Sequence, residues 1–142
     1  MQSQILDYIK TQRVGVLAVE MMDGSPHAAT VHFAHSESPL VFFFETSQGY
    51  RKCEPLFGRE VSRASFVIGS TESNMQTLQL DGEVRLVKED EQTFFDNVYF
   101  GKFPEKVGKN YAGKENVFFQ FTPTWWRFTD WTTPEGKVIL TS

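Results

Sequence analysis

Two adjacent cations, Arg51 and Lys52, follow directly after a polar turn, Thr46-Ser47-Gln48-Gly49. The turn ends an apolar run with three consecutive phenylalanines, and a short amphipathic segment begins at the cations. Hydroxyl groups, the unpaired N–H groups of a helix start and two cations together favour an anion such as phosphate. Each charge-assisted hydrogen bond from the cations would contribute about 1.5 to 3 kcal/mol. The pattern predicts a phosphate site, and a solvated helix face is the alternative.

Strands are the main elements expected to position this turn. Residues 40–46 begin with an unbroken apolar run at 40–44, which is typical of a strand buried on both faces. Asp23-Gly24 predicts a hairpin turn, and residues 49–57 read as a short helix. Further strands are expected at residues 13–21, 27–35, 64–71, 75–87, 117–131 and 137–141. Two further helices are expected, one from Ser3 to Ile9 and one over residues 90–100. Ser3 and Asp90 are their predicted caps.

These elements predict a mainly β (α+β) fold in a single domain over residues 1–142. Six or seven antiparallel strands would form a barrel, covered by two or three helices. A chain of 142 residues buries about two-thirds of its unfolded surface and needs no disulfide or structural metal. The single cysteine, Cys53, excludes an internal disulfide framework and a cysteine-rich zinc site.

Charge and composition narrow the classes of partner. The chain has 14 Lys and Arg against 18 Asp and Glu, with no basic stripe, which argues against nucleic acid. No apolar run has the ~18 to 20 residues needed to span a membrane, and the first ten residues do not resemble a signal peptide. We therefore expect a cytoplasmic protein. Aromatic residues make up 15% of the chain, with fourteen Phe, which suggests a flat ligand, a subunit interface or both.

The turn and four other motifs carry a resemblance to a known family. Thr46-Ser47-Gln48-Gly49-Tyr50-Arg51-Lys52 is similar to the Thr-x-x-Gly-Ser-Arg-Lys turn of the pyridoxamine 5′-phosphate oxidase-related FMN-binding split β-barrels. The motifs "DGSPHAATVHF", "ASFVIG", "LQLDGEVRLV" and "TPTWWRFTD" follow the family's order between about residues 14 and 130. The resemblance implies a homodimer with two FMN molecules at the subunit interface and a small-molecule substrate.

The resemblance also implies which residues contact the cofactor. Thr77 and Gln79 share one strand face and could reach the cofactor together, and Gln76 is the neighbouring alternative. The tryptophan pair, Trp125 and Trp126, would close over the flavin from the partner subunit, and the alternative is core or interface packing. The implied residues are Thr30 and Val31 along the flavin ring, Thr46, Ser47, Arg51 and Lys52 at the phosphate, Gln76, Thr77 and Gln79 on one strand, and Trp125, Trp126 and Arg127.

Departures from the oxidase concern its substrate. Where the oxidase reads Arg-x-Val-Leu-Leu-Lys, residues 29–34 read Ala-Thr-Val-His-Phe-Ala, so both cationic ends are missing. Where it reads Arg-Leu-His-Asp-Arg, residues 127–131 read Arg-Phe-Thr-Asp-Trp. Ala34, Thr129 and Trp131 thus stand where the oxidase has Lys, His and Arg. We expect an FMN site without oxidation of vitamin B6 phosphates.

Other chemistry-bearing residues give weaker hypotheses. His27, His32 and His35 alternate along one predicted strand, so His32 would lie opposite the other two and no metal triad is expected. Cys53, beside two cations, is a redox candidate if its pKa is lowered, and a half-buried helix cysteine otherwise. Residues 88–91, "KEDE", read as a solvated helix start, and the lysine-rich loop 101–116 lacks a P-loop pattern but could cover a ligand.

Three functional hypotheses remain. The first is an FMN-dependent oxidoreductase acting on an unknown small substrate, with no residue standing out as a general acid or base. The second is a sensor or carrier that holds flavin, deazaflavin or haem without turnover. The third is an interaction domain without a cofactor. The phosphate-binding cations, Arg51 and Lys52, favour FMN over haem.

Overall fold

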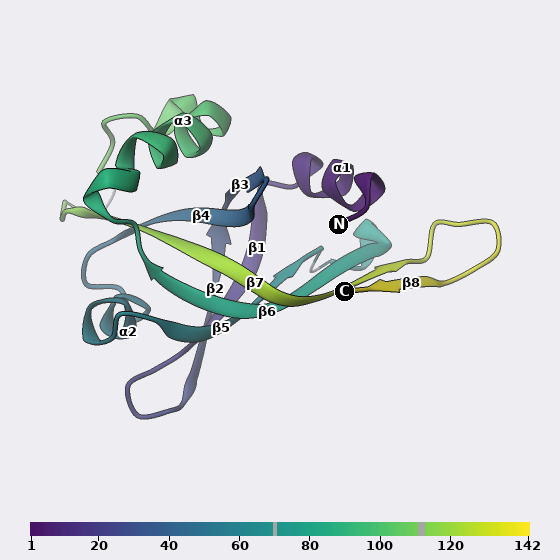
Figure 1. Cartoon of the computed structure of the whole chain (residues 1–142), viewed down its shortest axis with the longest axis horizontal. Helices are drawn as coiled ribbons and strands as arrows, with labels where there is room; N and C mark the ends of the chain where they lie inside the picture. Colours follow the sequence, from purple (N-terminus) through teal and green to yellow (C-terminus); the bar gives the residue numbers. More distant parts are fainter. Residues whose placement is uncertain (70, 111–112) are drawn as a thin grey trace.

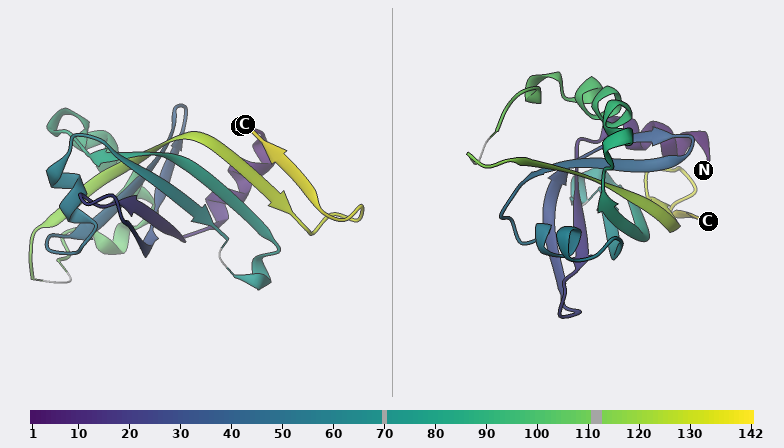
Figure 2. Two further views of the ribbon diagram at one scale, coloured as in Figure 1. Left: turned by 90° about the horizontal axis from the view of Figure 1, so that it is seen from below. Right: turned by 60° about the vertical axis from the view of Figure 1, so that its left-hand side comes forward.

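The computed structural model of the chain describes residues 1–69, 71–110 and 113–142 (Figure 1). The eight strands of this part form one antiparallel sheet in the order β2-β1-β5-β6-β7-β4-β3, and β8 pairs with β7. The sheet curls into a half-barrel (Figure 2). Its strands are β1 (Val14–Glu20), β2 (Pro26–His32), β3 (Ala34–Glu37), β4 (Leu40–Ser47), β5 (Ser62–Ile68), β6 (Gln76–Leu86), β7 (Asn116–Asp130) and β8 (Val138–Thr141).

Helices lie at the margins of the curled sheet (Figure 1). They are α1 (Ser3–Thr11), α2 (Cys53–Gly58) and α3 (Gln92–Lys102), and the short 3-10 turns are η1 (Glu72–Asn74), η2 (Glu89–Glu91) and η3 (Pro104–Lys106). None of the helices in the described ranges is long and apolar enough to cross a membrane. The predicted α+β split barrel with two or three covering helices is confirmed.

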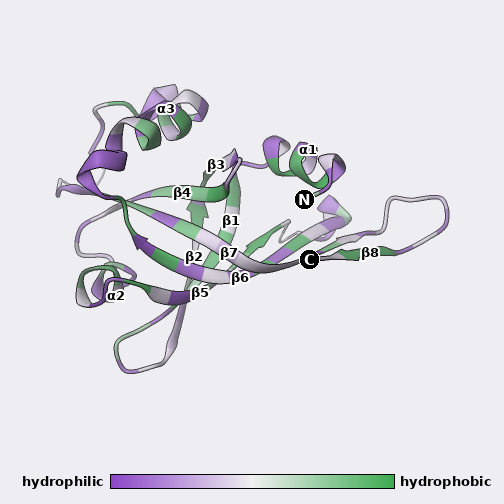
Figure 3. Ribbon diagram, in the orientation of Figure 1, coloured by the Kyte–Doolittle hydropathy of each residue, from purple (hydrophilic) through white to green (hydrophobic). Residues whose placement is uncertain are grey.

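Strand β4 is buried on both faces, as its unbroken apolar run predicts. Phe42 and Phe44 belong to the main core, inside the curled sheet. Phe43 points the other way into a second cluster, where it packs edge-on against Phe95 of α3 with ring centroids 5.6 Å apart. Figure 3 shows the apolar colouring of β4 and of parts of α3. Two apolar layers thus hold β4 in place, and the polar turn after it starts from a rigid strand.

The structure differs from the sequence-based expectation on the strand predicted at residues 27–35. This segment is two strands, β2 and β3, which makes eight strands in the described residues rather than six or seven. The break falls at Phe33, whose ring is fully buried against Phe42 and Phe66, and whose N–H donates to the Arg13 carbonyl at 3.0 Å. Because β2 pairs with β1 while β3 pairs with β4, the chain must change sheet partner here.

Both predicted helix caps are wrong, whereas the predicted hairpin is confirmed. Ser3 lies inside α1, whose cap position is Gln2, and no side chain caps that end. Asp90 lies within η2, where Glu91 accepts a hydrogen bond from the Lys88 N–H at 2.9 Å. At the hairpin, the Met21 N–H donates to the Ser25 carbonyl at 2.8 Å.

Two predicted segments extend beyond the described residues. The strand expected at residues 64–71 ends at Ile68, and position 70 lies outside the described residues. Positions 111–112 of the lysine-rich loop 101–116 also lie outside them.

Candidate functional site

A cavity of about 180 Å³ lies where β2, β4 and the turn before α2 meet. Its lining combines hydroxyl groups, two lysines, one histidine and one carboxylate. The residues are Thr30, Val31, His32, Glu45, Thr46, Ser47, Tyr50, Lys52, Lys106 and Asn116. Five of them, Thr30, Val31, Thr46, Ser47 and Lys52, are residues that the sequence resemblance implies at the cofactor. Their role there remains a prediction.

Lys52 is the buried cation of this cavity. Its residue is 8% exposed, and within the described residues no carboxylate lies within ion-pair distance of it. Burial lowers the pKa of its ammonium group, with the Cys53 thiol acting weakly in the opposite direction. Its Nζ lies 4.9 Å from the centroid of the Tyr50 ring. Because a buried charge without a partner is costly, the site favours an anion that would pair with Lys52.

Thr46 adds an unused hydrogen-bonding group to the same cavity. Its Oγ1 is buried and has no hydrogen-bond partner among the described residues. The neighbouring Ser47 is also buried. Both residues end β4, which pairs with β7 through Thr46 opposite Val117 and Ser47 opposite Asn116. Since buried hydroxyl groups normally have a partner, Thr46 is positioned to bind a ligand with polar oxygen atoms.

The other side of the cavity holds titratable residues that the sequence interpretation did not assign. Burial raises the pKa of the Glu45 carboxyl, and the Lys106 charge partly opposes that shift. Oε1 of Glu45 has no hydrogen-bond partner among the described residues. Burial also lowers the pKa of His32, further depressed by the charges of Lys106 and Arg13.

Lys106 belongs to the lysine-rich loop, where it is the last residue of η3, and it lines the cavity. Its Nζ donates to the Tyr99 hydroxyl at 3.3 Å and lies 4.8 Å from the centroid of the Phe103 ring. Burial lowers the pKa of this ammonium group, although Glu45 acts in the opposite direction. The loop therefore contributes to the lining of the cavity, and its role in covering a ligand stays a prediction. Two features of the sequence point to these unassigned residues. Glu45 directly precedes Thr46, and the loop that contains Lys106 is rich in lysine.

Arg51 does not line the cavity. The residue is exposed, whereas its neighbour Lys52 is buried. The charge of Arg51 acts on Asp23 rather than on the cavity. Hydrogen bonds from Ser25 lower the pKa of the Asp23 carboxyl, and the Arg51 charge contributes to this shift. The two adjacent cations thus have different environments, which provides an internal comparison for experiments.

Cys53 is not a reactive thiol in this structure. The residue is 4% exposed and begins α2, and its Sγ lies 3.5 Å from the Ser47 carbonyl oxygen. Burial raises the pKa of the thiol despite the nearby Lys52 charge. The hypothesis of a lowered pKa is therefore wrong, because burial outweighs the adjacent cation.

The remaining residues implied by the resemblance lie elsewhere. Gln76 and Thr77 line a pocket of about 370 Å³ with Trp131 at the opposite end of β7. Arg127 donates to Oε1 of Gln79 across the β6–β7 pair, from Nη2 at 2.8 Å. Trp125 is partly exposed, and Trp126 packs against the main core, in agreement with the packing alternative for this one tryptophan.

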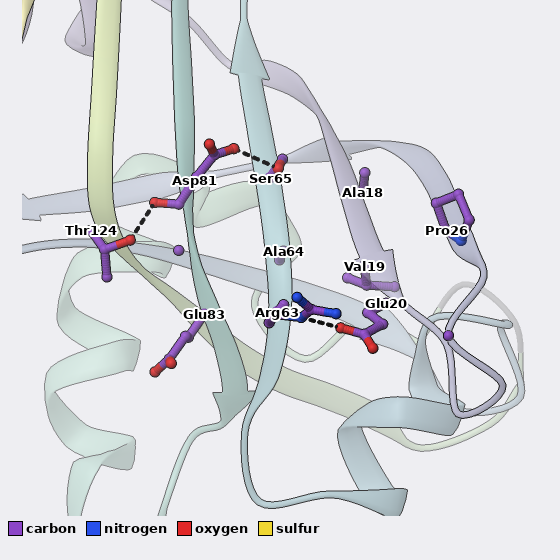
Figure 4. A pocket seen from close by; sticks show the side chains of 12 residues that line it. Ala18, Val19, Glu20, Pro26, Arg63, Ala64, Ser65, Asp81, Glu83 and Thr124 are labelled. Carbon is purple, nitrogen blue, oxygen red and sulfur yellow. Dashed lines mark hydrogen bonds and ion pairs between the residues drawn. The ribbon is translucent and has the colours of Figure 1, made fainter.

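A larger groove of about 570 Å³ crosses β1, β5 and β6 (Figure 4). Three of its four charged side chains, Glu20, Arg63 and Asp81, already have partners. Nε of Arg63 lies 2.5 Å from Oε2 of Glu20, and Oγ of Ser65 donates to Oδ1 of Asp81 at 2.7 Å. Among the described residues that line it, none carries a buried polar side-chain atom without a partner. The smaller cavity at Lys52 is therefore the better candidate site.

The histidines are distributed over separate environments. His27 of β2 lies opposite Val19 of β1, and His32 lines the cavity. His35 of β3 has a buried side chain that stacks on Phe42. In the part of the chain that the structure describes, no group of three metal-ligating side chains gathers in one place.

Comparison with known proteins gives the family. The profile of pyridoxamine 5′-phosphate oxidase matches residues 1–130. The chain belongs to the pyridoxamine 5′-phosphate oxidase family. A comparison with curated proteins gave no match. The family match covers every element from α1 to β7, so it includes both the cavity and the pocket at the far end of β7.

Solved structures show the same fold at low sequence identity. A conserved hypothetical protein from Mycobacterium tuberculosis is 20% identical with a TM-score of 0.68, covering 92% of this chain and 84% of that one. An FAD and haem binding protein from Mycobacterium smegmatis is 14% identical with a TM-score of 0.66, covering 99% and 82%. An FAD-binding protein from Mesorhizobium loti is 15% identical with a TM-score of 0.62, covering 90% and 94%.

Proposed function

We propose that this member of the pyridoxamine 5′-phosphate oxidase family binds FMN and acts as a flavin-dependent oxidoreductase on a small molecule. The observation that carries the proposal is the buried Lys52, which has no acidic partner within the described residues and shares a cavity with the unpaired hydroxyl of Thr46. A phosphate group would give both residues a partner. The FAD-binding relatives support a flavin in this fold.

The size of the cavity supports a site shared between two copies of the chain. Pockets for small molecules usually have about 300 to 1,000 Å³, whereas this cavity has about 180 Å³. One chain therefore offers room for the phosphate and part of the cofactor. We propose that a homodimer completes the site, with Trp125 and Arg127 of the partner subunit closing over the flavin. Trp125 is 38% exposed and available for such a contact.

Residues of this chain would bind and orient the cofactor. Lys52, Thr46 and Ser47 would hold the phosphate, and the β2 backbone at Thr30 and Val31 would lie along the ring system. A bound flavin supplies hydride or electron transfer. Glu45, Lys106 and His32 would set the charge and proton balance at the phosphate end, since all three line the cavity.

The substrate is not expected to be a vitamin B6 phosphate. A second phosphate needs its own cations, and Ala34 and Thr129 supply none. Trp131 is also uncharged, and Arg127, the cation that remains in these two motifs, is assigned to the flavin of the partner subunit. The FMN-loaded protein should therefore produce no hydrogen peroxide or pyridoxal phosphate from saturating pyridoxamine or pyridoxine phosphate. Clear turnover would show that this comparison with the oxidase is misaligned.

The proposal is tested first on the purified full chain. We expect a yellow dimer that carries about one FMN per chain, identified by mass after release by heat. The bound flavin should be reduced by a nicotinamide cofactor and reoxidised by an electron acceptor. A flavin that binds but is never reoxidised by any acceptor would favour a carrier or sensor. A colourless protein that remains empty after incubation with FMN would contradict the proposal.

A further inference from the structure

Lys106 is a second cation in the cavity of Lys52, and it comes from a distant part of the chain. It is the last residue of η3 and follows Lys52 by 54 residues. The turn motif contains the adjacent cations Arg51 and Lys52, but Arg51 is exposed and lies outside the cavity lining. The cavity therefore contains one cation of the motif and one that the motif does not include.

A phosphate monoester needs more positive charge than Lys52 supplies. Such a group carries a charge of about −1.5 to −2 at pH 7. Lys52 contributes one positive charge, whereas Thr46 and Ser47 offer only neutral hydrogen-bonding groups. Because an unbalanced charge is costly in a buried site, a dianion in this cavity favours a second cation beside it.

The ammonium group of Lys106 is held in place by aromatic rings. Its Nζ lies 4.8 Å from the centroid of Phe103, which is fully buried, and 5.7 Å from that of Tyr99. It also donates to the Tyr99 hydroxyl at 3.3 Å. Since an ammonium group has three N–H donors, two remain for a ligand. The rings thus position Lys106 without using its full binding capacity.

Other cations surround the same ring. The guanidinium carbon of Arg13 lies 4.8 Å from the Phe103 centroid, and Nζ of Lys102 lies 5.6 Å from it. Arg13 pairs with Glu105 at 2.9 Å, but within the described residues no carboxylate lies within ion-pair distance of Lys102 or Lys106. Burial lowers the pKa of the Lys106 ammonium group, and the Arg13 charge adds to that shift. An anion beside Lys106 would relieve this excess of positive charge.

Glu45 is the alternative partner of Lys106 inside the cavity. The two residues act on each other electrostatically, but no ion pair joins them. Burial raises the pKa of the Glu45 carboxyl, which shifts it toward its neutral form. A carboxyl in that form does not neutralise a cation, so Lys106 keeps its charge for a ligand.

We infer that Lys106 takes the place of Arg51 as the second cation at the phosphate of FMN. The phosphate would lie between Lys52, in the turn before α2, and Lys106, at the end of η3. This inference rests on the proposed function, and it differs from the motif, in which the two cations are adjacent. Lys106 is then a specificity-determining residue, because it favours FMN over riboflavin, which has no phosphate.

Affinities for FMN and riboflavin in lysine variants test the inference. Lys106→Met keeps the apolar stem and should weaken FMN binding by about tenfold, the lower limit for a charge-assisted contact, because the residue is half-buried. Riboflavin affinity should stay within about twofold of wild type, which also shows that the variant is folded. Lys106→Arg should retain the preference for FMN. Lys109→Met removes an exposed cation of the same loop and should change either affinity by less than about twofold. Equal weakening of both ligands by Lys106→Met would overturn the inference.

The Glu45→Gln background separates a direct contact from an effect through the carboxylate. If Lys106 binds the phosphate, Lys106→Met should still cause an FMN-specific loss of about tenfold when residue 45 is Gln. A loss that disappears in this background would mean that Lys106 only neutralises Glu45, and the inference would be wrong. An FMN-specific loss in Lys52→Met without one in Lys106→Met would overturn the inference and leave the proposed FMN site intact. Wild-type protein that shows no preference for FMN over riboflavin would contradict both.

Discussion

Arg127 and Gln79 are bonded to each other across β6 and β7: the guanidinium donates from Nε at 3.1 Å and from Nη2 at 2.8 Å to the same amide oxygen. Both residues are implied at the cofactor by the family resemblance. Arg127 is exposed and Gln79 is half-buried, so the contact satisfies Arg127 without fixing it in the core. A guanidinium has five N–H donors, so Arg127 keeps donors for a ligand while Gln79 orients it.

Arg127→Ala should separate a ligand-binding role from a structural one. Because the contact is exposed, the free energy of unfolding should change by less than about 1 kcal/mol in urea titrations. FMN affinity should fall several-fold, if Arg127 of one subunit binds the flavin held by the other. Arg63→Ala is the matched control, since it removes an exposed strand arginine that pairs with Glu20. Equal FMN affinity in the two variants would place Arg127 outside the cofactor site.

Glu45→Gln should raise FMN affinity and reduce its dependence on pH. Burial raises the pKa of this carboxyl, and the charged or titratable groups facing it are Lys106, Lys52 and His32. As the pH rises through that pKa, Glu45 becomes an anion beside the bound phosphate and should weaken FMN binding. The gain in the variant at pH 8 should be roughly tenfold, the effect of one like charge at several ångströms. Isothermal titration at pH 5 to 8 measures it.

Stability gives an independent readout of the same carboxyl. A raised pKa means that the folded state binds the proton more tightly than the unfolded state, so wild-type stability should fall as the pH rises from the unfolded pKa through the folded one. Glu45→Gln should lose that slope. Glu83→Gln, at an exposed position of β6, should retain it. A slope that is identical in all three proteins would mean that Glu45 is not the group responsible.

Gly69→Ala and Gly24→Ala should differ strongly in stability although both glycines have nearly the same φ, 84° and 85°. At Gly24 a Cβ meets nothing within 4 Å, so the cost should be that of a left-handed residue, about 1 to 2 kcal/mol. At Gly69 the same change also forces a contact with Tyr8 and Gln76, which should add about 1 to 3 kcal/mol. Equal losses in urea unfolding would mean that the Gly69 environment relaxes freely.

Local patterns predicted the parts of the fold that depend on neighbouring residues. The apolar run 40–44 predicted a strand with two buried faces, and Asp23-Gly24 predicted the hairpin, because both depend on side-chain pattern or turn chemistry. The break at Phe33 was missed because it arises from a change of sheet partner. Ser3 was a plausible cap by residue type, but α1 begins one residue too early for its hydroxyl to serve.

The candidate site was predictable only in part, for a similar reason. Thr46, Ser47 and Lys52 are close in sequence, and the structure keeps them together in the cavity. Arg51 turns outward because adjacent residues of a turn face different directions. Glu45 and Lys106 meet across a separation of 61 residues, a tertiary contact that no local pattern reports.

The central claim is that Lys52 binds the phosphate of FMN, and a comparison of FMN with riboflavin in two neighbouring variants tests it most directly. Lys52→Met keeps the apolar stem of a buried cation, and Arg51→Met removes the adjacent exposed cation as the matched control. We predict that Lys52→Met weakens FMN binding by about 10- to 150-fold, the loss of one charge-assisted contact, with riboflavin binding within about twofold of wild type. Arg51→Met should change either affinity by less than about threefold. Equal weakening of FMN and riboflavin by Lys52→Met, or a larger FMN-specific loss in Arg51→Met, would contradict the assignment of the phosphate to this cavity.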